Sequence, residues 1–388
     1  MRILMFSAIF PPAIGGPATQ SFNLCKALIK NNVVPVVVTY HESKTFSCSN
    51  KDGFNVYMFK SIYTGTVLDK IIRWIVFPFY IFYIIKKEKV QIVHCHSVSV
   101  LSFMAAAIAK LCGLPTIVKF AGDWVWETLS TSGVKAKDNE EIHTYSTYAR
   151  FLTVVQKLGL KFFDKIWVVS EFRRGNIRKL LGTDEKVIVI NNCLLLTGGH
   201  ARTWGNDETV IVISANRFIP HKRLDFMVQL FAEMNIPNSK LVMIGSGDQK
   251  EIQAVKDAIK KFNLEGKVEL PGKISFEEIY DRFSKASFYI STSIEEGFPN
   301  VYIEAMNYGL PVIATDEGGS KELVLDQKTG YMFVPSDHEK IVETMRKLAV
   351  DIPLRTELSK NSYERSRLFN LEIRVKDFIQ MYQNLLQK

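Results

Sequence analysis

Short apolar runs alternate with helix-like segments along this chain, and the alternation occurs twice. In the first half, strand-like runs lie at 2–8, 33–40, 90–96, 115–122 and 165–170. Helical sequence follows each of them. Continuous apolar strands that alternate with helices are typical of a parallel sheet covered on both faces. The sequence therefore predicts a doubly wound α/β fold.

The alternation begins again near residue 209. Strands and helices are expected in turn at 209–218, 223–234, 240–248, 249–264, 267–273, 275–286, 287–293, 300–309 and 310–319. Over 191–208 the periodicity fails and Gly and Asn cluster, which indicates a junction. We expect a first domain over 1–190, a linker over 191–208 and a second domain over 209–370. The helical tail 371–388 is expected to pack back on the first domain.

Composition limits the partners of a chain with 388 residues. The net charge of +9 favours anionic ligands, whereas no basic run is long enough to indicate a nucleic-acid tail. The five cysteines form no Cys-x-x-Cys pair, which favours a reducing cytoplasm over a disulfide framework. We therefore expect a cytoplasmic protein that does not bind nucleic acid.

The apolar stretch WIVFPFYIFYII (74–85) has two interpretations. As a helix it would span ~18 Å, too little to cross a hydrocarbon core of roughly 30 Å. One interpretation is a buried helix. The other is a patch that lies on an anionic membrane surface, since basic residues flank the stretch. These residues are Lys70, Arg73, Lys86, Lys87 and Lys89.

Several strands end in loops suited to anions, and ligands of open parallel sheets bind beyond the carboxyl ends of strands. After the first strand, Gly15 and Gly16 would let backbone approach a ligand, although a plain tight turn explains them as well. Arg217 and Lys222 follow the strand at 209–218 and could clamp a diphosphate, or form a solvated basic loop. Gly245 ends the next strand and permits close approach of a ligand.

The segment EEGFPNVYIE (295–304) carries the strongest signal. Gly297 suits a special turn and Pro299 suits the first turn of a helix. The N–H groups near Asn300 would point at an anion. Glu304, about one turn into the helix, can accept hydrogen bonds from vicinal hydroxyls, and Glu296 precedes the turn. The spacing is that expected around a phosphorylated sugar, and the alternative is a helix cap with an exposed Glu.

Three further side chains are candidates in the first half. Asp123 follows the run 115–122 and could orient an acceptor hydroxyl or the donor sugar, or cap the next helix. His94 and His96 alternate on one strand, but no third ligand lies nearby in sequence, so we expect no metal. His96, at the end of its strand, is expected to line a cleft.

These motifs together resemble the GT-B glycosyltransferases of family 4, retaining enzymes that use nucleotide-sugar donors. The resemblance spans nearly the whole chain. It rests on Gly15 with Gly16, Arg217 with Lys222, IGSGD (244–248), LPGKI (270–274), Glu296 and Glu304 with seven residues between them, and EGGSKEL (317–323).

The resemblance implies two Rossmann-like domains that face each other across a cleft, with the donor bound by the second. It implies that Arg217 and Lys222 hold the diphosphate, Glu304 the ribose hydroxyls and Glu296 the donor sugar. Further contacts are implied for Gly16, Gly245, Gly272, Lys273, Ile274, Phe298, Pro299, Asn300 and Val301. Many relatives carry a His where this chain has Asp123, so Asp123 joins Glu296, Arg217 and Lys222 as a catalytic candidate.

The implied reaction is a hexosyltransferase-type transfer to the hydroxyl of a glycan or lipid-linked acceptor, as in surface polysaccharide synthesis. Same-face attack would give retention, and the cationic site would replace a metal cofactor. Alternatives are a nucleotide-sugar epimerase or hydrolase, and a non-catalytic nucleotide-sugar-binding protein. A nicotinamide dehydrogenase is disfavoured, because the G-x-G-x-x-G fingerprint is missing.

Overall fold

The protein forms two compact units in a computed structural model that describes residues 1–13, 16–41, 46–60, 67–131, 139–205 and 209–387. The first unit comprises Met1–Asn191 and Leu371–Lys388, and the second comprises Asn192–Asn370. The described part of the expected linker, residues 192–205, therefore belongs to the second unit. Arg202 fixes it there by donating hydrogen bonds to the backbone carbonyls of Ser284 and Ala286, at 2.7 and 2.8 Å.

An eight-stranded sheet forms the centre of the first unit, in the order β3-β4-β2-β1-β5-β6-β7-β8. Only the pair β3–β4 is antiparallel among the described strands, which confirms the predicted parallel sheet. The strands are β1 (Arg2–Phe6), β2 (Val34–His41), β3 (Ser47–Lys51), β4 (Phe54–Lys60), β5 (Ile92–Cys95), β6 (Thr116–Phe120), β7 (Lys165–Val168) and β8 (Val187–Val189). Sequence reasoning did not single out β3, β4 and β8.

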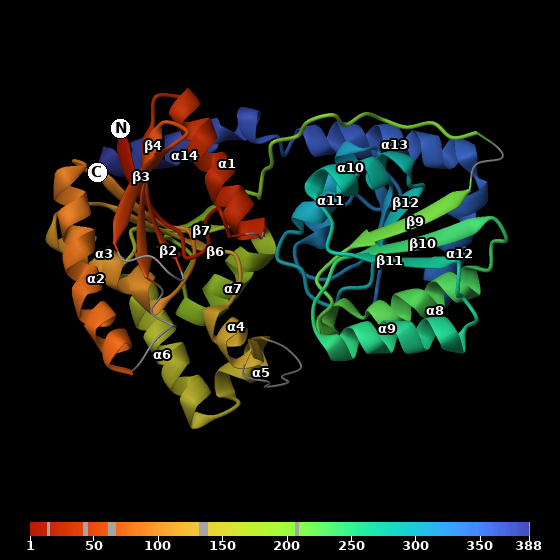
Figure 1. Cartoon of the computed structure of the whole chain (residues 1–388), viewed down its shortest axis with the longest axis horizontal. Helices are drawn as coiled ribbons and strands as arrows, with labels where there is room; N and C mark the ends of the chain where they lie inside the picture. Colours follow the sequence, from red (N-terminus) through yellow and green to blue (C-terminus); the bar gives the residue numbers. More distant parts are fainter. Residues whose placement is uncertain (14–15, 42–45, 61–66, 132–138, 206–208, 388) are drawn as a thin grey trace. The chain divides into compact units, whose positions relative to one another are not determined.

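Helices cover both faces of this sheet (Figure 1). On one face, α1 (Gly16–Lys30) packs against α14 (Leu371–Leu386). On the other face, α2 (Val67–Lys87), α3 (Val100–Leu111) and α6 (Thr147–Lys161) share one hydrophobic core with the strands. The remaining helices of the unit are α4 (Trp124–Thr131), α5 (Asn139–Thr144) and α7 (Glu171–Leu181).

The second unit has a six-stranded, wholly parallel sheet in the order β11-β10-β9-β12-β13-β14. Its strands are β9 (Val210–Ala215), β10 (Ser239–Ile244), β11 (Val268–Gly272), β12 (Phe288–Ser291), β13 (Val312–Thr315) and β14 (Gly330–Phe333). One face carries α8 (Leu224–Met234), α9 (Gln249–Lys261) and α12 (His338–Val350). The opposite face carries α10 (Phe276–Lys285), α11 (Asn300–Asn307) and α13 (Ile352–Arg367) (Figure 1).

Local sequence signals fix several helix ends. Ser275 and Glu278 form a capping box at the start of α10, which satisfies two backbone N–H groups that the helix leaves free. Ser170 caps α7 through the N–H of Arg173, and Gly182 ends that helix in the left-handed conformation with φ +77°. These signals make the helix boundaries local properties of the sequence.

The apolar stretch 74–85 lies within α2 and satisfies neither interpretation alone. Ile81 and Ile84 are completely buried in the core of the first unit, whereas Ile75 and Phe79 are 59% and 70% exposed. The helix is therefore apolar on both its inner and its outer face. No helix among the described residues combines the length and apolar character needed to cross a membrane.

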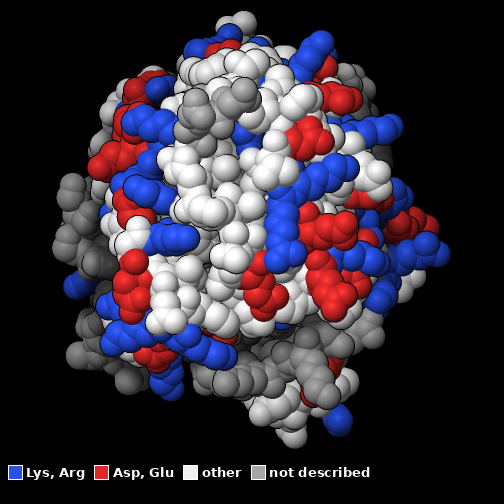
Figure 2. Space-filling view, turned by 90° about the vertical axis from the view of Figure 1, so that its right-hand side faces the viewer, with Lys and Arg blue, Asp and Glu red and all other residues white. Residues whose placement is uncertain are grey.

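The basic surplus does not form a single patch on the face of the second unit seen in Figure 2. Lys and Arg alternate there with Asp and Glu. Oppositely charged side chains of this unit also form ion pairs, such as Arg282–Glu269 at 2.7 Å and Lys321–Asp316 at 2.9 Å. A mixed surface gives little attraction for an extended polyanion.

The C-terminal helix is anchored in the first unit by a buried hydrogen bond and by ring contacts. The Tyr382 hydroxyl lies 2.8 Å from His94 Nδ1, and both side chains are completely buried. Phe378 packs edge-to-face on Trp167 with ring centroids 4.9 Å apart. The polar contact therefore specifies where α14 docks.

We predict that Tyr382→Phe lowers the free energy of unfolding of the first unit by about 1–3 kcal/mol, because His94 Nδ1 loses its buried partner. Denaturant unfolding monitored in the first unit measures the change. Tyr331→Phe in β14 is the control, since that ring is only partly buried. Equal stability of Tyr382→Phe and wild type would contradict the anchoring role.

Candidate active site

The strand order of the second sheet places a site at the edge formed by the carboxyl ends of its strands. β9 and β12 are neighbours, but the chain leaves β9 toward β10 on one side and β12 toward β13 on the other. The chain therefore departs in opposite directions after these two neighbouring strands, and open parallel sheets bind their ligands at such a point. Both predicted diphosphate cations follow β9, and both predicted acidic residues follow β12.

Lys222 and Glu296 meet directly at this edge. Lys222 Nζ lies 2.5 Å from Glu296 Oε1, and each side chain is only 12% exposed. Thr292, just after β12, holds the two loops together by donating to the carbonyls of Lys222 and Arg223, at 2.7 and 3.0 Å. The residue predicted to bind phosphate and the one predicted to bind sugar thus form one partly buried ion pair.

Two glycines after β13 fix the backbone of Glu296. Gly319 N–H donates to the Glu296 carbonyl at 2.8 Å. Gly318 has φ +64°, and a Cβ there would lie 2.0 Å from the same carbonyl oxygen. Only glycine fits so close to another backbone. The EGGSKEL motif therefore acts as a support for Glu296, a role that sequence reasoning did not assign.

Glu304 lies in α11 in a desolvated position. Burial raises the pKa of its carboxyl from 4.5 to about 7. Tyr280 of α10 is close enough for the Glu304 charge to raise the pKa of its hydroxyl further, after the larger effect of burial. The half-buried Glu304 side chain is suited to accept hydrogen bonds from ligand hydroxyls.

The start of α11 is suited to an anion. Its N-cap residue, Pro299, makes no side-chain capping hydrogen bond. Asn300 Oδ1 is buried without a hydrogen-bond partner among the described residues. Asn192 fixes the preceding loop by donating to the Phe298 carbonyl at 3.1 Å, and the buried Phe298 ring packs on Phe369 with centroids 5.5 Å apart. Val301, in the first turn, is half-buried.

The loops after β9, β10 and β11 also meet. Gly245 N–H donates to the Gly272 carbonyl at 2.9 Å, and a Cβ on Gly245 would lie 1.8 Å from the carbonyl oxygen of Asn216. Lys273 beyond this contact is exposed and Ile274 is half-buried. The LPGKI and IGSGD segments therefore meet through this backbone hydrogen bond.

The charges of Arg217 and Lys222 both act on His221. Burial lowers the pKa of His221, and the charges of Lys222 and Arg217 lower it further, while Glu296 and Glu295 oppose them. The Arg217 side chain is exposed. The structure thus gathers Arg217, Lys222 and Glu296 on the same edge.

In the first unit, only some of the predicted residues can be placed. Gly16 is exposed and begins α1, whereas Gly15 lies outside the described residues. His96 follows β5 and is 5% exposed, and neither of its ring nitrogens has a hydrogen-bond partner in the described part of the chain. Burial lowers the pKa of its imidazole, and Lys119 lowers it further. His96 is therefore a neutral buried ring near neutral pH.

Asp123 makes the contacts expected of a helix cap. Its Oδ1 accepts from the N–H groups of Val125 and Trp126, and its Oδ2 accepts from His143 and Gln156, both at 3.1 Å. Burial alone would raise its pKa, but these hydrogen bonds hold the pKa below the ordinary value. These four donors fix the Asp123 carboxylate at the start of α4, and its partners His143 and Gln156 carried no recognisable signal in the sequence.

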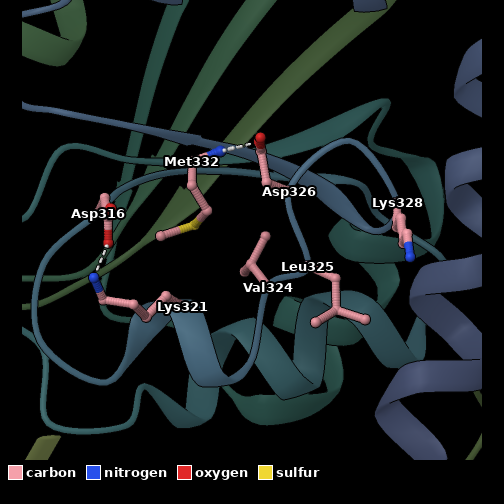
Figure 3. A pocket seen from close by; sticks show the side chains of 7 residues that line it. All are labelled: Asp316, Lys321, Val324, Leu325, Asp326, Lys328 and Met332. Atoms are coloured by element: carbon pink, nitrogen blue, oxygen red, sulfur yellow. Dashed lines mark hydrogen bonds and ion pairs between the residues drawn. The ribbon is translucent and has the colours of Figure 1, made fainter.

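A separate hollow of about 420 Å³ lies at the β13 and β14 side of the second unit. Figure 3 shows Lys321 paired with Asp316 and the Asp326 carboxylate bonded to the Met332 N–H. The centre of the hollow is formed by Val324 and Met332. None of the predicted site residues lines it. In the described part of the chain, no group of three or more His, Cys, Asp or Glu is placed to hold a metal ion.

Comparison with known proteins places this geometry in a family. Residues 14–194 match the model of "Glycosyltransferase Family 4", and residues 201–365 match that of "Glycosyl transferases group 1". The fold and both matches define a GT-B glycosyltransferase. The chain belongs to glycosyltransferase family 4, which confirms the class of enzyme and the fold expected from the motifs.

Three similar proteins illustrate the relationship. The phosphatidylinositol N-acetylglucosaminyltransferase GPI3 subunit of Saccharomyces cerevisiae is 23% identical over 99% of this chain and 83% of its own length. Sucrose-phosphate synthase from Thermosynechococcus elongatus has the same fold, with a TM-score of 0.79, 19% identity and coverage of 100% and 99% of the two chains. The structure of the Anabaena protein HepE in complex with UDP-glucose has a TM-score of 0.74 and 14% sequence identity. The match covers 99% of this chain and 100% of that protein.

We predict that Glu304→Gln removes a pH dependence from the stability of the second unit. The folded unit holds this proton with a pKa of about 7, against 4.5 when exposed. The stabilisation is therefore complete below pH 4.5 and is lost as pH rises through about 7. Thermal unfolding from about pH 5 to about pH 8 should show the wild type losing stability relative to the variant. Parallel profiles would contradict the raised pKa.

Proposed function

We propose that this enzyme transfers a hexosyl group, with retention, from a nucleoside diphosphate sugar to a hydroxyl of a glycan or lipid-linked acceptor. The observation that carries the proposal is the edge formed after β9 and β12, where Lys222 contacts Glu296 at 2.5 Å and α11 begins without a side-chain cap. Cations and free N–H groups suit a diphosphate, and the flanking carboxylates suit sugar hydroxyls.

Donor binding would rearrange the charges at this edge. The diphosphate brings negative charge to Lys222, so the ammonium group exchanges part of its contact with Glu296 for phosphate oxygens. Glu296 then becomes free to accept hydrogen bonds from the sugar. Glu304, which lies in a position where it is costly to ionise, gains hydroxyl donors from the ribose.

Transfer would then depend on stabilising the departing diphosphate. As the bond between the sugar carbon and the phosphate oxygen breaks, Lys222, Arg217 and the N-terminus of α11 would offset the growing negative charge. The acceptor hydroxyl attacks the same face of the sugar, and a phosphate oxygen of the leaving group takes its proton. The protein supplies positioning and electrostatics, and no divalent metal is needed. Asp123 remains our candidate for orienting the acceptor hydroxyl or the donor sugar, while its hydrogen bonds also fix the start of α4.

The acceptor and location follow from weaker observations. The relative from yeast is named for a phosphatidylinositol substrate, and neighbouring structures hold UDP-glucose. With a net charge of +9, the chain suits an anionic membrane surface. We place the reaction in the cytoplasm at the inner membrane face, in the synthesis of a surface polysaccharide or lipid-linked glycan.

We predict that Lys222→Ala lowers the affinity for a nucleoside diphosphate by about tenfold or more, because a charge-assisted hydrogen bond is lost. Isothermal titration with UDP and GDP measures the affinity. The matched control is Lys321→Ala, which also removes an ion-paired lysine of the second unit but lies at the separate hollow. A larger loss in the control would move the nucleotide site to that hollow.

We predict that the purified enzyme forms product only when an acceptor is present, with the anomeric configuration of the donor and with equal rates in EDTA. NMR of the product, using donors selected by thermal shift, measures the configuration. Release of free or epimerised sugar without an acceptor would favour the hydrolase or epimerase alternative. An inverted product, or loss of activity in EDTA, would refute the retaining or the metal-free mechanism respectively.

A further inference from the structure

The outer face of α2 carries exposed apolar side chains between Ile71 and Tyr83. Six large side chains are each 47–70% exposed, namely Ile71, Ile72, Ile75, Phe79, Phe82 and Tyr83. With 3.6 residues per turn they lie on one side of the helix, opposite the buried Phe77, Ile81 and Ile84. A surface helix of a soluble domain ordinarily presents polar residues on that side.

Helix α6 repeats this arrangement, which sequence reasoning did not detect. Five large apolar side chains on α6 and its C-cap are 48–62% exposed, namely Tyr148, Phe151, Val154, Leu158 and Phe162. They lie away from the buried residues Leu152, Gln156 and Leu160. Two helices of the same unit thus carry outward apolar stripes.

The two stripes belong to the same layer of the first unit. Helix α3 packs against both α2 and α6 on one face of the sheet (Figure 1). The approach of α6 is close, since a Cβ on Gly159 would lie 2.4 Å from the Phe103 ring of α3. Exposed apolar side chains that belong to one layer of helices can together contact a single partner surface.

All charges along the stripes are positive. The segments 71–87 and 147–161 contain no Asp or Glu. On α6 the charged residues are Arg150, Lys157 and Lys161, all exposed on one flank of the apolar stripe. Lys86 and Lys87 lie over the rings of Phe82 and Tyr83, at 5.6 and 5.4 Å.

Two acidic residues that follow these helices are engaged in contacts with other side chains. Glu88, which follows α2, is 6% exposed and accepts hydrogen bonds from Arg2, Asn55 and Tyr57. Asp164, which follows α6, pairs with Lys110 at 2.5 Å. Within the segments 71–87 and 147–161, the charge pattern therefore presents cations beside apolar side chains.

We propose that the outward stripes of α2 and α6 form one lipid-binding surface that docks the first unit on an anionic membrane. Apolar side chains would enter the boundary between headgroups and acyl chains, while the lysines contact anionic headgroups. A second copy of the chain fits less well, since pairing of these faces would oppose cations to cations. The inference refines the membrane location proposed above, but lipid binding requires no sugar transfer and is tested separately.

Flotation of the full-length protein with lipid vesicles tests the surface. Wild type should bind vesicles of phosphatidylcholine with phosphatidylglycerol more tightly than vesicles of phosphatidylcholine alone. Phe151→Glu with Leu158→Glu on α6, and Phe79→Glu with Phe82→Glu on α2, should each lower the partition coefficient by about tenfold or more. Lys157→Ala with Lys161→Ala should reduce mainly the preference for the anionic lipid.

The matched control is Val350→Glu with Leu368→Glu, which introduces the same charges at positions of the second unit that are 68% and 55% exposed. It should bind vesicles as the wild type does. Circular dichroism and the thermal shift with nucleotide show whether each variant folds and keeps its donor site. If the α6 variant floats with vesicles as the wild type does, α6 is not part of the lipid-binding surface. A dimer in sedimentation that the variants dissociate, without vesicle binding, would overturn the proposal in favour of a second copy.

Discussion

Parallel strands require crossover helices, and this constraint organises the whole enzyme. Each crossover returns the chain to the same end of the sheet, so the loops after the strands of a unit collect at one edge. In the second unit the chain moves in opposite directions from β9 and β12, which are neighbours. The site therefore lies where the loops diverge, and its side chains come from segments far apart in sequence.

Charge compensation keeps this edge folded without a ligand. Glu296 neutralises Lys222 at 2.5 Å, and the pair is only 12% exposed, so either charge alone would be costly to desolvate. Glu304 has no ion-pair partner among the residues that the structure describes, and burial raises its pKa to about 7. The site is thus arranged for a ligand that brings phosphates to the lysine and hydroxyl donors to the carboxylates.

Whereas the site of the second unit is polar, the first unit exposes apolar side chains on α2 and α6. Such exposed apolar patches lower solubility and commonly mark interaction sites. Their cationic borders suit a lipid surface, which would hold the enzyme where a lipid-linked acceptor is found. Asp123 of this unit caps α4 by accepting from the N–H groups of Val125 and Trp126.

The sequence alone determined what depends on short-range order. Strand and helix alternation predicted both sheets, and the spacing from Glu296 to Glu304 located α11 and its open N-terminus, because periodicity and turn residues act over a few positions. The weak strands β3 and β8 escaped notice, since neither carries a fully buried apolar run. Only the tertiary structure showed that Gly318 supports Glu296, that His143 and Gln156 bind Asp123, and that α6 turns apolar side chains outward. These facts depend on which distant segments pack together, and the face a helix buries is chosen by its neighbours in space.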